Sequence, residues 1–494
     1  MHGGVSANEQ NPQFHQQMVY AVAASVLNQF DRALGRTLWF SRGRRLRLYP
    51  HAFVGANAFF LPDENAVVFG YFQAGRNPGP NLPGQYVFTC LSHDIVAHEV
   101  THAVVHRLRP YFRQRTNPQV GAFHEAMADI VAVLLHFRLE GVLERALAQA
   151  GIDLAEATPL VELGGQFGYA RGDTAALRSA LKDPDPAALA NAKTEHRRGA
   201  ILLAAVFDAF RSAYRAEVAP LLALLDPLQP DVPLDERLIR TLAAAARTIA
   251  DRLLLLCIRS FEYLPPTDVT FGDFLRALVT ADVEIFPSDE TGLRGRMIEA
   301  FRLHGIMPEG AYSLAEESLR WDPFDNTTLK KPLPINPEYV FADAARLRED
   351  RIHGKTSERR NSANRAWFGA LAEWVAPNAE ALGFQGAPVE IGGFHTSFRF
   401  DQDAQPRFDA VVELRQRFDV PGLDSAGPTP VYAGKLVVAD ASGQVRYVIG
   451  RQPPNDSEAG RQRIDELRSF VRDEAMVTDG AHPLLIDFGA LHDG

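Results

Sequence analysis

Cysteine is scarce in this chain of 494 residues, which contains only Cys90 and Cys257. Two cysteines cannot form a disulfide framework, so we expect two separate buried thiols, as in a protein of a reducing compartment. Long hydrophobic runs are missing too, since none approaches the roughly 18 unbroken apolar residues that span a bilayer. Residues 1–14 lack a basic run followed by an apolar stretch. We therefore expect no signal peptide and, by default, a cytoplasmic protein, with export by another route left open.

An excess of positive charge is also missing. The chain has 51 Lys and Arg against 61 Asp and Glu, a net charge of -10. No general attraction to nucleic acid or to an anionic membrane surface is expected from this balance. With 46% hydrophobic and 23% charged residues, the composition is that of a globular protein. The length is sufficient for roughly three to four domains.

Hydrophobic spacing predicts an α+β protein whose first part is mostly helical. Apolar residues recur at helical intervals in several segments, and short β-like runs separated by turn residues lie near the start. The predicted helices are 14–34, 92–108, 120–138, 196–214, 233–263 and 271–281. The predicted short strands are 37–40, 46–49, 57–61 and 66–72.

The last third of the chain has a different character. Residues 308–337 carry Pro, Asn and Asp without clear periodicity, which predicts a linker. Beyond it, 398–400, 411–414 and a hairpin over 435–449 alternate like strands, and 461–476 has helical spacing. We therefore predict an additional α+β domain over 338–494. This domain could present a peptide, restrict access to a cleft or bind a partner, and the sequence does not choose between these roles.

Two histidines four residues apart supply the clearest chemical signal. In the segment 97–102, Ala-His-Glu-Val-Thr-His, helical geometry places His98 and His102 on one face, where both imidazoles can bind one ion. Glu99 lies one residue further round the helix, near enough to hold a metal-bound water. The third ligand therefore decides which class of site this is.

The third ligand separates the families that share this HExxH motif. A metzincin would have glycine at position 105 and histidine at position 108, where this chain has Val105 and Leu108. The segment 121–130 instead supplies Glu125 within an apolar helical pattern, with Asp129 one turn later. Glu125 can be the third ligand, and Asp129 can accept the free N–H of a ligating histidine and fix its tautomer.

Five blocks of the chain, in order, resemble those of the thermolysin-like zinc metallopeptidases, a gluzincin group. The blocks are 57–60 (Asn-Ala-Phe-Phe), 94–97 ahead of the HExxH, 121–129, 177–184 and 195–201. The resemblance implies the two-lobe catalytic unit of that family. A mixed α/β lobe with the HExxH helix would cover 1–118, and a helical lobe would cover 119–307. The predicted domain over 338–494 lies outside the resemblance.

The resemblance also implies a catalytic role for each matched residue. His98, His102 and Glu125 would bind one catalytic zinc ion and leave a fourth position for water. Glu99 would take a proton from that water and later deliver it to the leaving amine. His196 would donate to the oxyanion that develops in the transition state.

Substrate contacts are implied at further positions. Asn57 and the backbone of Ala58 would hold an extended peptide as an added strand. Arg178 would bind a substrate carbonyl. The family's second oxyanion donor is a tyrosine between the two zinc-binding blocks, and Tyr111 is the only tyrosine there.

Three positions depart from the family pattern. His124 stands where the family has an asparagine, and it can either hydrogen-bond to His102 or compete for the metal. Asn191 replaces a carboxylate five residues before the transition-state histidine. Asp94 matches a calcium ligand of the family, but His136 replaces a partner carboxylate, which argues against a calcium site.

The sequence therefore predicts a zinc-dependent metalloendopeptidase that acts on peptide or protein substrates, with no nucleic-acid or membrane partner. Two alternatives stay open. A zinc exopeptidase would need an extra acidic or aromatic group to capture a free amino terminus, and no such motif is evident. A zinc-binding scaffold that no longer hydrolyses peptides would use the C-terminal domain for interaction.

Overall fold

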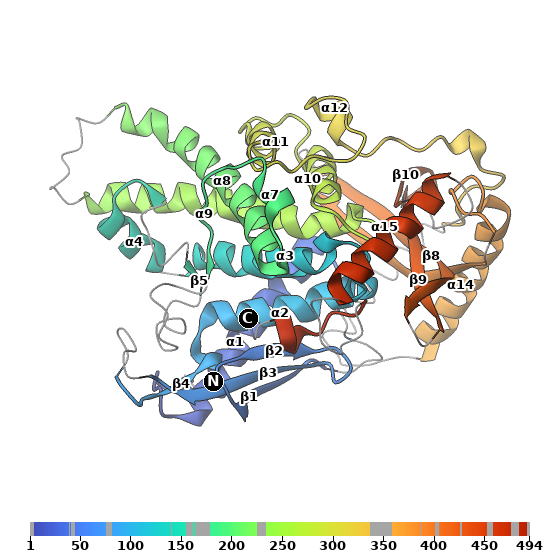
Figure 1. The fold of residues 1–494 in the computed structure, drawn as a ribbon. Coiled ribbons are helices and arrows are strands. Elements are labelled where there is room, and N and C mark those ends of the chain that lie inside the picture. The colour runs from blue at the N-terminus through green and yellow to red at the C-terminus, as the bar shows by residue number, and fades with distance from the viewer. Residues whose placement is uncertain are drawn as a thin grey trace.

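A computed structural model gives the fold of the chain (Figure 1). It describes residues 4–38, 40, 45–75, 82–139, 141–154, 162–163, 178–224, 234–335, 358–386, 388–400, 405–424, 427–451, 458–475 and 484–491. Within these ranges, no helix is both long and apolar enough to cross a bilayer.

The first part of the chain folds into a long helix, a small sheet and a buried helix. Its elements are α1 (Pro12–Leu34), β1 (Arg47–Val54), β2 (Ala58–Leu61), β3 (Ala66–Gln73), β4 (Tyr86–Phe88), η2 (Thr89–Leu91), α2 (His93–Leu108) and η3 (Pro110–Arg113). β3 pairs in parallel with β1 and antiparallel with β2 and β4, so β2 is an edge strand of the described sheet. The sheet lies below α2 in Figure 1, and α2 contacts β2, β3 and α1.

Local sequence explains both ends of α1. Asn11 caps the first turn by accepting a hydrogen bond of 3.0 Å from the Gln13 N–H. Gly35 ends the helix in the left-handed conformation, at φ +66°. The predicted strand over 37–40 is wrong, because the described residues 37, 38 and 40 form no strand. The Leu38 N–H instead donates to Asp31 Oδ1 at 2.8 Å, which folds this segment back onto α1.

The middle of the chain is mostly helical and is built around one buried helix. Its elements are α3 (Pro118–His136), α4 (Val142–Ala150), β5 (Glu162–Leu163), β6 (Arg178–Ser179), α7 (Ala188–Asn191), α8 (Glu195–Leu222), α9 (Glu236–Arg259), η5 (Ser260–Tyr263), α10 (Phe271–Ile285) and α11 (Leu293–Leu303). Every residue of α3 from Val120 onward is buried, as its nearly continuous apolar sequence requires. α3 packs against both α2 and α8, and it lies between them in Figure 1.

The last part of the chain forms an antiparallel sheet with helices. Its elements are α12 (Glu316–Leu319), η6 (Asn326–Thr328), α14 (Glu358–Asn378), β7 (Val389–Phe400), β8 (Pro406–Asp424), β9 (Gly427–Asp440), β10 (Val445–Ile449), α15 (Glu458–Ala475) and α16 (Phe488–Leu491). The strand order is β10-β9-β8-β7. The predicted hairpin between β9 and β10 is confirmed, and its Gly443 has a φ of +86°.

The two faces of this C-terminal sheet serve two different cores. Val411 and Val438 belong to the large core shared with the helices, whereas their neighbours Val412 and Val437 face a smaller core with Trp374 of α14. Alternate residues of a strand point to opposite faces, which explains the division. The sheet therefore completes the main core and does not stand apart from it. The prediction of an α+β fold is confirmed at this coarse level.

Candidate metal centre

The HExxH segment lies in α2, which is buried without interruption from Val96 to Val105. His98 and His102 lie one turn apart, and their Nε2 atoms are 3.0 Å apart. Residues four apart share one face of a helix, so the two ring nitrogens converge on one point. Glu99 lies on the same helix with only 2% of its surface exposed.

α3 brings a third ligand-type group to this point. Glu125 Oε2 lies 3.6 Å from His98 Nε2, and Glu125 Oε1 lies 3.3 Å from His102 Nε2. A tetrahedral zinc ion with bonds of about 2.0–2.1 Å holds its ligand atoms about 3.3 Å apart. The measured separations of 3.0, 3.3 and 3.6 Å lie on either side of that value. These three buried side chains, which we call the helix cluster, therefore form a group that could hold a metal ion.

Asp129 orients one of the two imidazoles. It follows Glu125 by one turn of α3, and its Oδ1 lies 2.8 Å from His98 Nδ1, with both side chains buried. An ionised carboxylate can only accept a hydrogen bond, so Nδ1 of His98 donates and carries the proton. The lone pair is then on Nε2, which faces Glu125 and His102. This is the tautomer that a metal ion requires.

Two glycines allow α8 to approach the helix cluster closely. A Cβ at Gly199 would lie 3.1 Å from Glu125 Cβ, and a Cβ at Gly121 would lie 1.9 Å from the Glu195 carboxylate. The missing side chains bring His196 Nδ1 to 2.9 Å from Glu125 Oε2. The His196 side chain is 31% exposed, so this side of the helix cluster opens toward solvent.

His124 lies behind the helix cluster, beside His102. The two ring centroids are 5.7 Å apart, and the Phe488 ring lies 5.2 Å from His124 and 5.0 Å from His102. Burial first, and then the charges of His102 and His106, hold the pKa of His124 well below its usual value, so the imidazole is neutral. Neither ring nitrogen of His124 has a hydrogen-bond partner in the described part of the chain. The hydrogen bond to His102 that the sequence allowed is therefore not formed within those residues.

A segment near the C-terminal end contacts η3 and then the edge strand β2. The Ile486 N–H donates to the Arg113 carbonyl at 2.9 Å, and α16 then packs against β2. Asn57 Nδ2 donates to the Gly489 carbonyl at 3.3 Å, while Asn57 Oδ1 accepts from the Ala58 N–H at 2.7 Å. The amide that was predicted to hold a substrate backbone thus holds the backbone of the chain itself.

Sequence reasoning missed this C-terminal segment. Leu484, Ile486 and Phe488 are buried, whereas Leu485 and Asp487 between them are exposed. This burial pattern is that of a half-buried extended segment. The sequence does not show the pattern clearly, because the exposed Leu485 makes residues 484–486 three apolar residues in a row.

Tyr111 and Arg178, two of the predicted site residues, are not seen to contact the helix cluster in the described part of the chain. The Tyr111 hydroxyl contacts Arg415 of β8, whose guanidinium lies 5.1 Å from the Tyr111 ring centroid, and the Tyr432 ring of β9 packs at 4.6 Å. Burial raises the pKa of Tyr111 despite the opposing charge of Arg415. The backbone of Arg178 pairs with Leu163 in the sheet of β5 and β6, and its side chain lies outside the described residues. The structure thus brings His98, His102, Glu125, Asp129, His124 and His196 together, and it places Tyr111 against the C-terminal sheet.

Comparison of the chain with protein-family models and with curated proteins gives no match. The chemistry of the helix cluster therefore rests on its own geometry. Two imidazoles, a carboxylate and an orienting aspartate are a donor set suited to zinc, and the separations fit that ion.

Proposed function

We propose that the chain is a zinc-dependent metalloendopeptidase whose catalytic ion is held by His98, His102 and Glu125. One observation carries the proposal, namely the buried helix cluster with zinc-like separations and a carboxylate, Glu99, beside it on α2. Three protein ligands that leave a further position open are typical of catalytic zinc, whereas structural zinc is closed by four.

Zinc in such a site lowers the pKa of a water to about 7 and polarises a substrate carbonyl. Glu99 takes the proton of the attacking water and delivers it to the nitrogen of the broken peptide bond. Protonated His196 would keep Nδ1–H toward the Glu125 carboxylate and donate from Nε2–H to the developing oxyanion. Asp129 holds His98 in the tautomer that presents its lone pair to the ion.

The proposed peptide-binding edge is β2 with the preceding Asn57. An extended peptide would add to this edge by main-chain hydrogen bonds, which makes recognition largely independent of side chains. Because Asn57 Nδ2 already donates to the Gly489 carbonyl, a long substrate has to displace α16 from that amide. Short peptides are therefore the first substrates to test.

The replacement Glu99→Gln tests the mechanism without touching a ligand atom. We expect the variant to retain its zinc and to lose about 10²–10⁴-fold in kcat/KM for an internally quenched peptide, since it lacks the general base. The matched control is Glu217→Gln, at an exposed position of α8, which should change neither quantity. Unchanged hydrolysis by Glu99→Gln would refute the mechanism. A purified protein without bound zinc would refute the assignment of a zinc ion to the helix cluster.

The pattern of cleavage distinguishes the endopeptidase from its two alternatives. Internal cuts in casein or a blocked peptide support an endopeptidase, and stepwise trimming from one end supports an exopeptidase. Zinc binding without hydrolysis of either supports a scaffold. The contact between Asn57 and Gly489 favours this alternative, because it occupies the amide that would otherwise hold a substrate backbone.

A further inference from the structure

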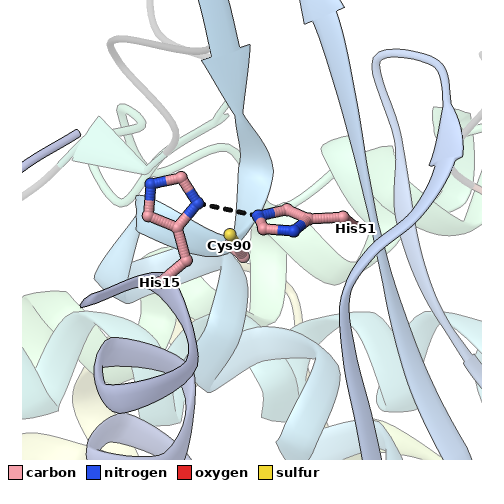
Figure 2. A group of neighbouring side chains, drawn as sticks. All are labelled: His15, His51 and Cys90. Atoms are coloured by element: carbon pink, nitrogen blue, oxygen red, sulfur yellow. Dashed lines mark hydrogen bonds between the residues drawn. The ribbon is translucent and has the colours of Figure 1, made fainter. Parts of the chain in front are cut away.

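A second group of ligand-type side chains lies just before α2 and shares no residue with the helix cluster. His15, His51 and Cys90 each offer one ligand atom, and these atoms all lie within 4.8 Å of one another. They come from α1, β1 and η2, and we call them the thiol cluster. Figure 2 shows the Cys90 sulfur next to the hydrogen bond that joins the two imidazoles.

The hydrogen bonds of His15 fix its tautomer. His15 Nε2 lies 2.8 Å from the Glu9 carbonyl oxygen, which can only accept, so Nε2 carries the proton. The lone pair of neutral His15 is then on Nδ1, which lies 2.7 Å from His51 Nε2. A histidine that donates one N–H to a backbone carbonyl and points its other nitrogen at a cluster has the arrangement of a metal ligand.

The thiol cluster is enclosed on one side and open on the other. The Cys90 side chain is completely buried and His15 is 1% exposed, whereas His51 is exposed. The Phe88 ring lies 4.6 Å from the His15 ring and 5.3 Å from the His51 ring. An ion can therefore reach the three ligand atoms from the His51 side, and a water can complete its coordination there.

We propose that His15 Nδ1, His51 Nε2 and Cys90 Sγ bind a divalent transition-metal ion of the zinc class. Imidazole nitrogen and thiolate sulfur suit zinc and cobalt(II), whereas calcium and magnesium take oxygen ligands. Zinc bonds of about 2.1 Å to nitrogen and 2.3 Å to sulfur correspond to ligand separations of about 3.3–3.6 Å. The 2.7 Å between the two ring nitrogens has to open by only about 0.6 Å to reach that range.

Binding has a defined proton balance. The thiol proton of Cys90 leaves to solvent. In the metal-free chain His51 Nε2–H donates to His15 Nδ1, so on binding His51 gives this proton to solvent and takes one up on Nδ1, which turns its Nε2 lone pair to the ion. His15 neither gains nor loses a proton, because its Nε2–H already donates to the Glu9 carbonyl and its Nδ1 already carries the lone pair. No oxidant or reductant takes part.

The position of the thiol cluster gives the ion a structural role. Cys90 belongs to η2, and α2, which carries His98 and His102, begins at His93. An ion held by the thiol cluster would join the first turn of α1 and strand β1 to the segment that leads into α2. It would therefore stabilise the start of the helix on which the helix cluster is built.

Cobalt(II) is the probe that separates the two clusters, because the helix cluster contains no sulfur. Under reducing, anaerobic conditions, cobalt(II) added to the metal-free full-length chain should give a thiolate-to-cobalt charge-transfer band in the near ultraviolet. Zinc should displace the band. The double variant His98→Ala/His102→Ala should keep it, which shows that it does not depend on the helix cluster or on activity.

Matched variants assign the band to its ligands. Cys90→Ser and His51→Gln should abolish it, and Cys257→Ser, which alters the other buried thiol, should leave it unchanged. His51 is exposed, so His51→Gln removes a ligand without opening a core cavity and remains informative if Cys90→Ser folds poorly. The absence of any thiolate band in the parent chain overturns the proposal, as does a band that survives His51→Gln.

Discussion

The helix cluster and the thiol cluster are assembled in opposite ways. The first takes His98 and His102 from a single helix and its third group from the helix packed against it, and all three side chains are buried. The second takes one group each from a helix, a strand and a short 3-10 turn, and one of its imidazoles reaches solvent. The spacing of four residues along one helix fixes the relative positions of His98 and His102. In the thiol cluster, only the packing of α1, β1 and η2 fixes the positions of the three side chains.

The groups that orient the histidines differ as well. In the helix cluster His98 donates to the side chain of Asp129, and in the thiol cluster His15 donates to the backbone carbonyl of Glu9. A carboxylate can be removed by substitution, but a backbone carbonyl cannot. The two clusters should therefore respond differently when the orienting residue is replaced, and this difference can be measured.

The largest expected effect is on peptide hydrolysis, and it distinguishes the proposed catalytic role of the helix cluster from the proposed structural role of the thiol cluster. His102→Ala removes a ligand of the helix cluster and should lower kcat/KM for peptide hydrolysis by about 10³-fold or more, because several kcal/mol of transition-state stabilisation depend on the ion. His51→Gln removes a ligand of the thiol cluster and should leave kcat/KM within a few-fold at 25 °C. Equal losses of activity in the two variants would show that the clusters do not have separate roles.

A smaller effect is expected at Asp129. Asp129→Asn should weaken zinc binding to the helix cluster about 10- to 100-fold, since the orienting carboxylate of His98 is lost. Competition with a chelator measures the affinity, in a Cys90→Ser background so that only the helix cluster binds. Asp153→Asn, which alters a carboxylate paired with Arg215 near the surface, is the control and should not change the affinity.

Thermal unfolding would compare the contributions of the two proposed ions to stability. Zinc at about 100 times its Kd adds about 2.7 kcal/mol to the stability of a protein that binds it only when folded. A chelator should therefore lower the Tm of the parent chain more than that of His51→Gln, which has lost one of the two sites. An identical shift in both proteins would count against a stabilising ion in the thiol cluster.

The smallest effect is expected at Glu9. Glu9→Gln leaves the backbone carbonyl that accepts from His15, so neither the cobalt-thiolate band nor the stability should change by more than about 0.5 kcal/mol. Together with Asp129→Asn, this variant tests whether orientation by a side chain and orientation by the backbone really differ. A loss of the band in Glu9→Gln would contradict that reading.

Much of the helical framework could be predicted from hydrophobic spacing, and the misses have physical causes. α1, α2 and α3 begin and end within two residues of the predicted helices, because apolar residues recur in them at helical spacing. α8 begins one residue before its predicted start but continues to Leu222, well beyond the predicted end at 214. α11 was not predicted, and its Arg294 is buried because Asp282 pairs with it at 2.8 Å. Because arginine is expected at the surface, the sequence does not show that this side of α11 is buried. The smaller core behind the C-terminal sheet, which α14 shares, could not be foreseen either, because contacts between distant segments leave no local period.

The sequence by itself determined the local chemistry of this protein. It placed two histidines, a glutamate and an aspartate at helical intervals, and the α-helix has one geometry that turns such intervals into a shared face. Only the tertiary structure decided that α3 packs against α2 with Glu125 beside His98 and His102, and that α8 approaches α3 closely at Gly121 and Gly199. It also decided that Gly489 reaches Asn57 and that Cys90 lies between His15 and His51. Such contacts join residues tens to hundreds of positions apart, and the packing of the whole core, not any local rule, sets their distances.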